Sequence, residues 1–362
     1  MIGLTGAIGT GKSNVLQTLV SLGAHGIDAD RVAHQVMETG GPAYEPVVAA
    51  FGPDILGPDG QIDRQRLGAR VFGEEGALRR LEGIIHPAVA EVLRVQAAAS
   101  TAPMVVIEAI KLLEAGLGRT LCDPVWVTTC SRRQQFARLA ASRGMLPEQV
   151  RRRLAAQMPA REMAAQADRV IDTGGTIAAT RLVVLRAWVE LGLPLPEPRI
   201  RPAVLDDAGG MAAVLNAVVR EGGLSVIDRT FTPAQERAFL RGLPERARLT
   251  VAEVGKVLAG FQIIEPYAKR AYTAAMDHVA TLGTYVAASV RGTGLGRRLS
   301  EETFKQARAA GYVKLVAQVR ADNPAANGFC IRLGFLPCGR LARQVRVADR
   351  YVDVLLFEMF LE

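Results

Sequence analysis

The chain has 362 residues, of which 49% are apolar and 22% charged, and its formal net charge is +8. This composition excludes a disordered or fibrous protein, and the length favours two domains, each able to bury its own core. No run reaches the roughly 18 apolar residues of a membrane span, and no signal peptide precedes the first strand-like run, so we expect a cytoplasmic protein without membrane contact.

The four cysteines form no C-x-x-C pair, so neither a disulfide framework nor a zinc site is expected. The positive charge comes mainly from arginines spread along helical patterns with few aromatic residues between them. We therefore do not expect nucleic acid as a partner. Arginine also suits small phosphate-bearing ligands, because its planar guanidinium matches phosphate geometry.

Short strand-like runs alternate with long helical patterns in the first half of the chain. The runs are residues 1–5, 26–28, 104–108, 124–128 and 170–172. This alternation is typical of an α/β fold in which helices flank a parallel sheet.

The first strand-like run leads directly into G-A-I-G-T-G-K-S at residues 6–13, followed by a helical pattern. The stretch fits the G-x-x-x-x-G-K-[ST] phosphate-binding loop, or P-loop. In such a loop backbone N–H groups surround the phosphates, Lys12 reaches the outer phosphates, and the Ser13 hydroxyl binds Mg²⁺. We predict a nucleoside triphosphate site here.

Two aspartates, Asp28 and Asp30, follow the second strand-like run. In an open parallel sheet they would emerge at the same edge as the P-loop, where ligands bind. Phosphoryl transfer needs one carboxylate to orient or deprotonate the attacking hydroxyl and another to hold water on the metal. Asp28 and Asp30 could supply both, although capping of the following helix is an alternative for either residue.

Further motifs follow in a fixed order, namely His86-Pro87, L-L-E at residues 112–114, and E-Q-V-R-R-R-L-A-A-Q followed by A-D-R-V-I-D-T-G-G. With the P-loop and I-D-A-D, they make the chain resemble dephospho-coenzyme A kinases from residue 1 to about 192. The resemblance implies a P-loop kinase fold with a lid. It also implies transfer of a phosphoryl group from ATP to the 3′-hydroxyl of dephospho-CoA, with Asp30 as the base and Arg138 as the catalytic arginine.

The same resemblance implies a set of ATP-binding residues: Gly9, Thr10, Gly11, Lys12, Ser13 and Asn14. Ser13 and Asp28 are the candidate Mg²⁺ ligands. The candidate acceptor-binding residues are Asp28, His86, Glu108 and Arg143.

Each of three acceptor candidates has an open alternative. A histidine before proline is an ordinary device at a helix start, so a structural role for His86 is equally favoured. Glu108 ends an apolar strand, where a metal-holding carboxylate is expected, but the segment after it lacks the proline common in the family. Arg143 fits a solvated helix face as well as a ligand site.

The segment L-P-L-P-E-P-R-I-R-P, residues 193–202, contains four prolines. Proline removes backbone donors and keeps the chain extended, so we predict a linker over 193–199 between a domain at 1–192 and a domain at 200–362. The second domain begins with a helix over 206–221 and a hairpin over 251–264 with its turn at Gly255-Lys256. A strand over 282–290, a helix, a strand over 314–319 and a short helix follow, which indicates a mixed α/β fold.

The strand over 282–290 leads into a second glycine-rich turn, R-G-T-G-L-G, which opens a helix. Its backbone N–H groups suit an anion, but it lacks the lysine and serine needed for a triphosphate and a metal. This turn and the residues up to Gly334-Phe335 resemble the acetyl-CoA-binding core of the GNAT N-acetyltransferase superfamily, and residues 200–362 follow the family's element order. The resemblance implies acetyl-CoA contacts at Val286, Arg291, Gly292, Thr293, Gly294, Leu295, Gly296 and Asn323.

One position departs from the family. GNAT proteins commonly carry a tyrosine seven residues after the asparagine, where it protonates the thiolate of CoA, and this chain has Cys330 there. A thiol with an ordinary pKa of about 8.5 can donate a proton, but it is shorter than tyrosine. Cys330 is therefore the candidate general acid, and Glu253, Glu265 and His278 are unranked candidates for the general base.

The sequence thus predicts a bifunctional enzyme whose small-molecule substrates are ATP, dephospho-CoA, acetyl-CoA and an unidentified amine. Two alternatives stay open: the second domain could bind acetyl-CoA as a regulatory module without chemistry, or the first could be another small-metabolite kinase or a regulatory NTPase. The sequence gives neither the acceptor amine nor the oligomeric state.

Overall fold

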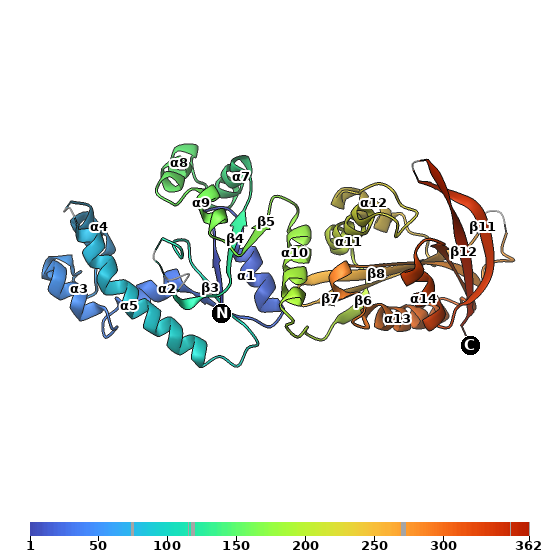
Figure 1. The fold of residues 1–362 in the computed structure, drawn as a ribbon, viewed down its shortest axis with the longest axis horizontal. Coiled ribbons are helices and arrows are strands. Elements are labelled where there is room, and N and C mark those ends of the chain that lie inside the picture. The colour runs from blue at the N-terminus through green and yellow to red at the C-terminus, as the bar shows by residue number, and fades with distance from the viewer. Residues whose placement is uncertain (74–75, 115, 117–119, 269–272, 348, 362) are drawn as a thin grey trace. The chain divides into compact units, whose positions relative to one another are not determined.

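The computed structural model describes residues 1–362 except 74–75, 115, 117–119, 269–272, 348 and 362 (Figure 1). The chain divides into two compact units, Met1–Gly175 and Thr176–Glu362. None of the helices in the described ranges is long and apolar enough to cross a bilayer.

A five-stranded sheet with the order β2-β3-β1-β4-β5 forms the centre of the first unit, and all its described strand pairs are parallel. The strands are β1 (Ile2–Thr5), β2 (His25–Asp28), β3 (Val105–Glu108), β4 (Val125–Thr129) and β5 (Arg169–Asp172). Each bound lies within one residue of the predicted run. The central strand β1 is buried at every position, as expected for a sheet covered on both faces. The predicted parallel α/β fold is confirmed.

The helices of the first unit gather in groups around this sheet. They are α1 (Lys12–Ser21), α2 (Ala29–Gln35), α3 (Tyr44–Phe51), the 3₁₀ turn η1 (Pro53–Ile55), α4 (Arg64–Gly73), α5 (Ala77–Ala98), α7 (Arg132–Arg143), α8 (Pro147–Ala155) and α9 (Ala160–Ala165). Helices α3, α4 and α5 pack together on one side of the sheet, and α7 packs with α8 on another (Figure 1).

Pro87 does not lie at a helix start, as the sequence pattern suggested, but inside the 22-residue helix α5. A proline costs a helix one backbone hydrogen bond and crowds the carbonyl four residues earlier. Apolar side chains on both sides of Pro87 pack against the same core, among them Leu81, Ile85, Val89 and Leu93. Their burial stabilises the helix through the proline.

The second unit contains a seven-stranded sheet with the order β11-β12-β10-β9-β8-β7-β6. Its strands are β6 (Arg199–Pro202), β7 (Arg248–Val254), β8 (Val257–Pro266), β9 (Val279–Val286), β10 (Lys314–Arg320), β11 (Leu336–Val347) and β12 (Arg350–Phe360). Only the pair of β9 and β10 is parallel among the described pairs. This mixed α/β fold is the one expected for a GNAT-type domain.

Helices cover both faces of this sheet. They are α10 (Ile177–Glu190), η2 (Leu205–Asp207), α11 (Ala208–Glu221), α12 (Pro233–Arg241), η3 (Ala288–Val290), α13 (Leu295–Ala309) and α14 (Pro324–Arg332). Helices α11 and α12 lie over one face and α13 over the other (Figure 1). Two apolar clusters fill the spaces: α11 packs against β7 and β8, and α13 packs against β8, β9 and β10.

Two details differ from the sequence-based expectations. The segment 199–202, at the end of the proline-rich stretch, is the edge strand β6, and Pro202 is tolerated there because an edge strand needs fewer backbone donors. Residues 288–290 form the 3₁₀ turn η3 instead of extending the strand β9. The first domain's end at residue 192 stays a prediction; in the structure α10 packs against α11, β8 and η3.

Candidate functional site

The P-loop has the backbone conformation that a phosphate site requires. Gly9 and Gly11 have φ values of 78° and 86°, a region that favours glycine. A Cβ atom at Gly9 would lie 3.0 Å from Cγ of Leu139, so the loop also packs too closely for a side chain there. Gly11 caps α1, and the N–H groups of this helix start therefore face the loop.

Lys12 is 7% exposed, and its ammonium group donates a hydrogen bond to the Gly6 carbonyl at 2.8 Å. Burial lowers the pKa of Lys12, whereas the negative charges of Glu108 and Asp30 act in the opposite direction. The lysine therefore lies within the loop and within electrostatic range of both carboxylates. An incoming phosphate would offer the ammonium group a stronger partner than a neutral carbonyl.

The carboxylates predicted at the sheet edge do come together. The parallel register places Asp28 beside Glu108 and Glu108 beside Leu4, directly before the P-loop. Burial, and then the charge of Asp28, raises the pKa of Asp30. Burial also raises the pKa of Glu108, and Lys12 opposes this shift. A half-buried carboxylate with a raised pKa next to a cation is a suitable proton acceptor for a hydroxyl.

Asp28 fulfils the structural alternative that the sequence left open. Its side chain accepts a hydrogen bond from the N–H of Arg31 at 3.1 Å and caps α2. Asp30 lies in the first turn of the same helix, where the helix dipole favours a negative charge. The cap thus orients the turn that carries Asp30.

Arg138 lies against the P-loop. Its guanidinium donates to the side-chain oxygen of Thr173 at 2.9 Å and to the Thr173 carbonyl at 2.5 Å. A Cβ atom at Gly11 would lie 3.4 Å from one of its nitrogens. Thr173 in turn donates to the Thr10 carbonyl at 2.7 Å. Arg138 is therefore held beside the position where Lys12 begins the helix.

In the described part of the chain, the remaining predicted residues of the kinase site make no hydrogen bond to Lys12, Asp30 or Arg138. Ser13 is exposed at the start of α1, and Thr10 is buried with its hydroxyl bonded to the Ala7 carbonyl at 2.7 Å. Arg143 is exposed at the end of α7, although its charge acts on Lys12. His86 lies in the middle of α5, and its contact with an acceptor stays a prediction.

Sequence reasoning missed several side chains that hold the P-loop in place. Gln135 donates to the Ile8 carbonyl at 3.0 Å, and Gln157 accepts from the Ile8 N–H at 3.0 Å. Thr173 joins the loop to Arg138, as described above. Thr173 and Gln157 had a signal, because Thr173 lies in the T-G-G that follows a predicted strand and Gln157 ends the motif that begins at Glu148; Gln135 lies in an ordinary helical pattern.

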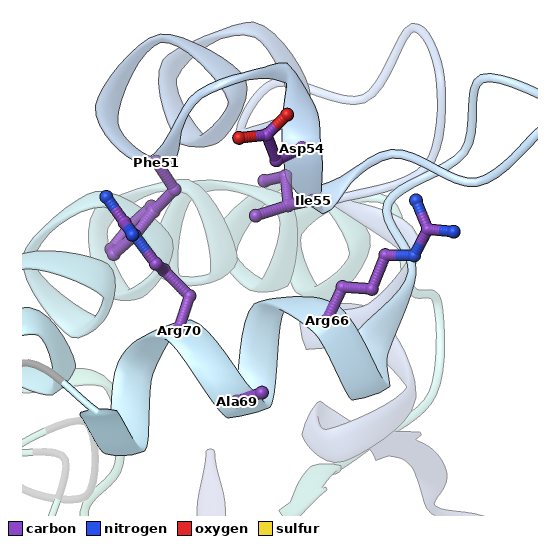
Figure 2. Close-up of a pocket in the computed structure, with 6 residues that line it drawn as sticks. All are labelled: Phe51, Asp54, Ile55, Arg66, Ala69 and Arg70. Carbon is purple, nitrogen blue, oxygen red and sulfur yellow. The ribbon is translucent and has the colours of Figure 1, made fainter.

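A surface cavity of about 280 Å³ lies between α3, η1 and α4 of the first unit (Figure 2). Its lining residues are Phe51, Asp54, Ile55, Arg66, Ala69 and Arg70. Arg66 also donates to the Leu56 carbonyl at 2.6 Å. None of the residues predicted for the kinase site lines this cavity.

The second unit has an opening between two parallel strands. Pairing of β9 with β10 ends at Leu282 and Ala317, although β9 continues to Val286 and β10 to Arg320. Beyond Leu282, β9 pairs only with β8. Backbone groups of Gly283–Val286 that would face β10 are therefore available to an extended ligand.

The glycine-rich turn follows this open strand edge. Gly292 and Gly294 have φ values of 80° and 88°, and Gly294 caps α13. The Arg291 guanidinium is bound by the Glu221 carboxylate, at 2.6 Å and 3.1 Å, and by the Val286 carbonyl. Arg291 therefore fixes the turn, and the backbone N–H groups are the groups left to meet an anion.

Three further residues of the turn have packing roles. The Thr293 hydroxyl donates to the Val290 carbonyl at 2.8 Å, and Leu295 is buried. A Cβ atom at Gly296 would lie 3.2 Å from the Phe329 ring, so the glycine permits a close approach of α13 and α14.

Asn323 and Cys330 are both buried, at 6% exposure each. The Asn323 amide donates to the Leu224 carbonyl and accepts from the Ala326 N–H, which caps α14. Cys330 lies in the apolar cluster with Phe304 and Phe335, where burial raises the pKa of its thiol to about 11. The thiol is protonated at neutral pH, as a general acid must be, and its catalytic role stays a prediction.

The structure separates the three candidates for the general base. Glu253 forms an ion pair with Arg201 at 2.7 Å, so its carboxylate already has a partner and is poorly suited to accept a proton from an amine. His278 is exposed at the N-terminal side of β9, at the end away from the open strand edge. Glu265 on β8 is half-buried, and burial raises its pKa. Of the three, only Glu265 combines burial with a free carboxylate among the described residues.

Comparison with known proteins agrees with the division into two units. The dephospho-CoA kinase family profile matches residues 1–179, and the acetyltransferase (GNAT) family profile matches residues 224–335. A dephospho-CoA kinase of Geobacter metallireducens is 44% identical over 193 residues, which cover 52% of this chain and 96% of that protein. One of Symbiobacterium thermophilum is 44% identical over 191 residues, 52% of this chain and 80% of that protein.

Solved structures that resemble the chain include an N-acetyltransferase from Staphylococcus aureus. It is 24% identical, with a TM-score of 0.42, and the match covers 46% of this chain and 100% of that one. TT1252 from Thermus thermophilus is 30% identical, with a TM-score of 0.47, and the match covers 53% of this chain and 97% of that one.

Proposed function

The chain belongs to the dephospho-CoA kinase family through its first unit, and we propose that this unit transfers the γ-phosphoryl group of MgATP to the 3′-hydroxyl of dephospho-CoA. The observation that carries the proposal is the convergence of Lys12, Asp30 and Glu108 at the P-loop edge of the sheet. A switch GTPase would not need a half-buried carboxylate there to activate a hydroxyl.

Each group has a distinct part in this reaction. Asp30 accepts the proton of the attacking hydroxyl, whose oxygen forms a bond to the γ-phosphorus as the bond to the β-phosphate oxygen breaks. Lys12 and Arg138 stabilise the negative charge on the transferring group. Ser13 Oγ and the carboxylates of Asp28 and Glu108 are hard oxygen donors of the kind Mg²⁺ prefers, and Mg²⁺ would neutralise phosphate charge.

The described residues contain no group of three or more side chains that would hold a metal by themselves. This agrees with the usual behaviour of Mg²⁺ at phosphate sites, where one or two protein oxygens suffice because the substrate phosphates and water supply the other ligands.

The test is a coupled assay of ADP release with dephospho-CoA as acceptor. We expect Asp30→Asn to retain ATP binding, measured by calorimetry, and to lose at least 100-fold in kcat, within the range for removal of a general base. Asp59→Asn, in an exposed turn of the same unit, is the matched control and should behave as the wild type. Unchanged turnover by Asp30→Asn would refute the assigned role, and ATP turnover indifferent to dephospho-CoA would refute the acceptor.

For the second unit we propose binding of acetyl-CoA and transfer of its acetyl group to an amine. The support is the open edge of β9 followed by a glycine-rich helix start, which together suit an extended pantetheine chain and a pyrophosphate. Calorimetry with acetyl-CoA tests the binding, and thiol release in the presence of amines tests the transfer.

A regulatory module that binds acetyl-CoA without chemistry is the second candidate for this unit. The burial of Cys330 in the core, where the family commonly has a tyrosine, favours it. Binding of acetyl-CoA without thiol release for any amine would support this alternative.

A further inference from the structure

Fully buried polar side chains belong to α13 and to the two strands it packs against, β7 and β8. Thr250 on β7, Gln262 on β8, and Ser300 and Thr303 on α13 are each 0% exposed. Burying a polar side chain costs free energy unless its hydrogen bonds to water are replaced. Each of these residues therefore has to find its partners inside the protein, and the partners show what the residue connects.

Gln262 connects three elements. Its amide nitrogen donates to the Thr284 hydroxyl on β9 at 2.7 Å and to the Ser300 hydroxyl on α13 at 3.0 Å. The register places Gln262 directly opposite Thr284. Ser300 in turn donates to the Gly296 carbonyl at 2.9 Å. Because the single hydrogen of the Ser300 hydroxyl is used there, Ser300 can only accept from Gln262, and the amide nitrogen must be the atom that faces both hydroxyls.

The two ends of this hydrogen-bond chain lie at the two parts of the proposed acetyl-CoA site. Thr284 belongs to the part of β9 beyond Leu282, where pairing with β10 has ended. Gly296 lies in the first turn of α13 and is the last glycine of R-G-T-G-L-G. Gln262 lies on β8, which pairs with β9 and packs against α13. It is therefore placed to fix the spacing between the strand edge and the glycine-rich turn.

The rest of the Gln262 amide shows that packing alone does not explain this residue. Its oxygen is buried and has no hydrogen-bond partner among the described residues. An unpaired buried carbonyl destabilises the folded state, whereas methionine would fill a similar volume without a polar atom. What the glutamine adds over an apolar residue is the pair of hydrogen bonds that its nitrogen donates to β9 and α13.

Thr303 provides a comparison within the same buried set. It is as deeply buried as Gln262 and lies on the same helix as Ser300. Its hydroxyl donates to the Leu299 carbonyl at 2.9 Å, within α13 itself. Thr303 therefore joins no second element, and its loss should not alter the spacing between β9 and the glycine-rich turn.

We propose that Gln262 is a positioning residue of the second unit, which holds the open edge of β9 and the glycine-rich turn at the spacing required by a ligand that spans both, an acyl-CoA. The inference rests on the proposed binding of acetyl-CoA and adds a residue that prepares the site. A ligand that meets both places gains affinity when their spacing is fixed in advance, because its second contact is then intramolecular. A fragment that meets only one place gains nothing from this spacing.

The experiment compares acetyl-CoA, which can span both places, with ADP, whose pyrophosphate can meet only the turn. Hydrogen exchange of the full-length protein is titrated with each ligand and read on peptides within residues 279–302, so that binding to the first unit does not contribute. We expect Gln262→Met to weaken acetyl-CoA at least tenfold and ADP less than threefold. Thr303→Val, the matched buried control, should leave both affinities unchanged.

A second variant interrupts the chain at another bond. Thr284→Val removes the hydroxyl that accepts from Gln262, at a position that is only partly buried, and should weaken acetyl-CoA far more than ADP, as Gln262→Met does. Thermal melts establish that each variant is folded, and Thr284→Val alone decides the matter if Gln262→Met is not.

Three results would overturn the proposal: wild-type affinity for acetyl-CoA in the folded variants, an equal loss of affinity for acetyl-CoA and ADP, or failure of ADP to protect the turn of the wild type. An equal loss would mean that the substitution disturbs the turn itself and not the spacing. Failure of the proposed function looks different, because acetyl-CoA would then protect neither the strand edge nor the turn in the wild type.

Discussion

Arg138 shows how one side chain can join α7 to the P-loop. Its two terminal nitrogens bind two different atoms of Thr173, and Thr173 binds the Thr10 carbonyl. A lysine at this position would keep the positive charge, but its single ammonium group could not reproduce the two parallel N–H donors of the planar guanidinium. We expect Arg138→Lys to lower kcat at least tenfold with less than a threefold change in ATP affinity.

Steady-state kinetics and calorimetry with ATP measure the two quantities for Arg138→Lys. Arg132→Lys, at the exposed start of the same helix, is the matched control. A normal kcat for Arg138→Lys would mean that the guanidinium geometry is unimportant and that only its charge acts.

Glu236, which is 5% exposed on α12, should impose a pH dependence on stability. Burial raises its pKa in the folded protein above the ordinary value of 4.5. Between the unfolded and folded pKa values the folded state binds more protons than the unfolded state, so the free energy of unfolding falls as pH rises through this window. Above the folded pKa the carboxyl is ionised in both states, and the buried charge destabilises the folded state fully. Glu236→Gln, which carries no charge, should therefore melt at a higher temperature than the wild type at neutral pH.

Calorimetric melts of both proteins, from about pH 4 to about pH 7, would check this expectation. The difference in melting temperature should be small at the acidic end and grow towards neutral pH. A constant difference would show that Glu236 keeps an ordinary pKa in the folded protein.

At the level of residues, the sequence predicted groups whose spacing is diagnostic and missed groups whose role depends on burial. Lys12 and Asp30 could be predicted as site residues because a loop pattern and a strand end locate them. Glu236 gave no signal, because an acidic residue in the first turn of a helix is ordinary. Only the packing of α12 shows that its side chain is buried.

Strand β6 is attached to the sheet edge by an ion-pair network as well as by backbone pairing. Arg201 binds Asp207 and Glu253, each at 2.7 Å, and Asp207 is 8% exposed. Arg201→Met would leave a nearly buried carboxylate unpaired, which we expect to cost roughly 2–4 kcal/mol of unfolding free energy. Arg199→Met, on an exposed side chain of the same strand, should cost much less.

Urea denaturation of the full chain, followed in the transition of the second unit, measures this cost. Adding Asp207→Asn and Glu253→Gln to Arg201→Met should recover part of the stability, because no charge is then left unpaired. Equal stability of Arg201→Met and Arg199→Met would contradict the network's role.

At the level of elements, apolar runs determined what could be predicted. The three inner strands of the first sheet, β1, β3 and β4, are short, buried runs between helical patterns, whereas the edge strands β2 and β5 are only partly buried; all five were predicted from the sequence. The last two strands, β11 and β12, were missed because most of β11 is exposed and carries no clear alternation of apolar and polar residues. β6 was read as part of a linker because its proline is typical of extended, unpaired chain.

Helix α10 determines where the two units can be separated. Its position after β5 makes it look like the last helix of the first domain, and the sequence placed the boundary after it. In the structure it contacts α11, β8 and η3, and η3 leads into the glycine-rich turn. Its residues Val184, Leu185 and Trp188 are completely buried. Removing α10 should therefore expose apolar surface and loosen the turn that we expect to bind pyrophosphate.

Two fragments test this expectation. Residues 176–362 should melt cooperatively and bind acetyl-CoA as the full chain does. Residues 193–362, which follow the boundary predicted from the sequence, should melt at a lower temperature and bind acetyl-CoA at least tenfold more weakly, because three buried side chains of α10 are lost at roughly 1.5–3 kcal/mol each. If both fragments are equally stable and bind equally well, α10 is dispensable to the second unit, and the boundary at residue 192 is the better description of the chain.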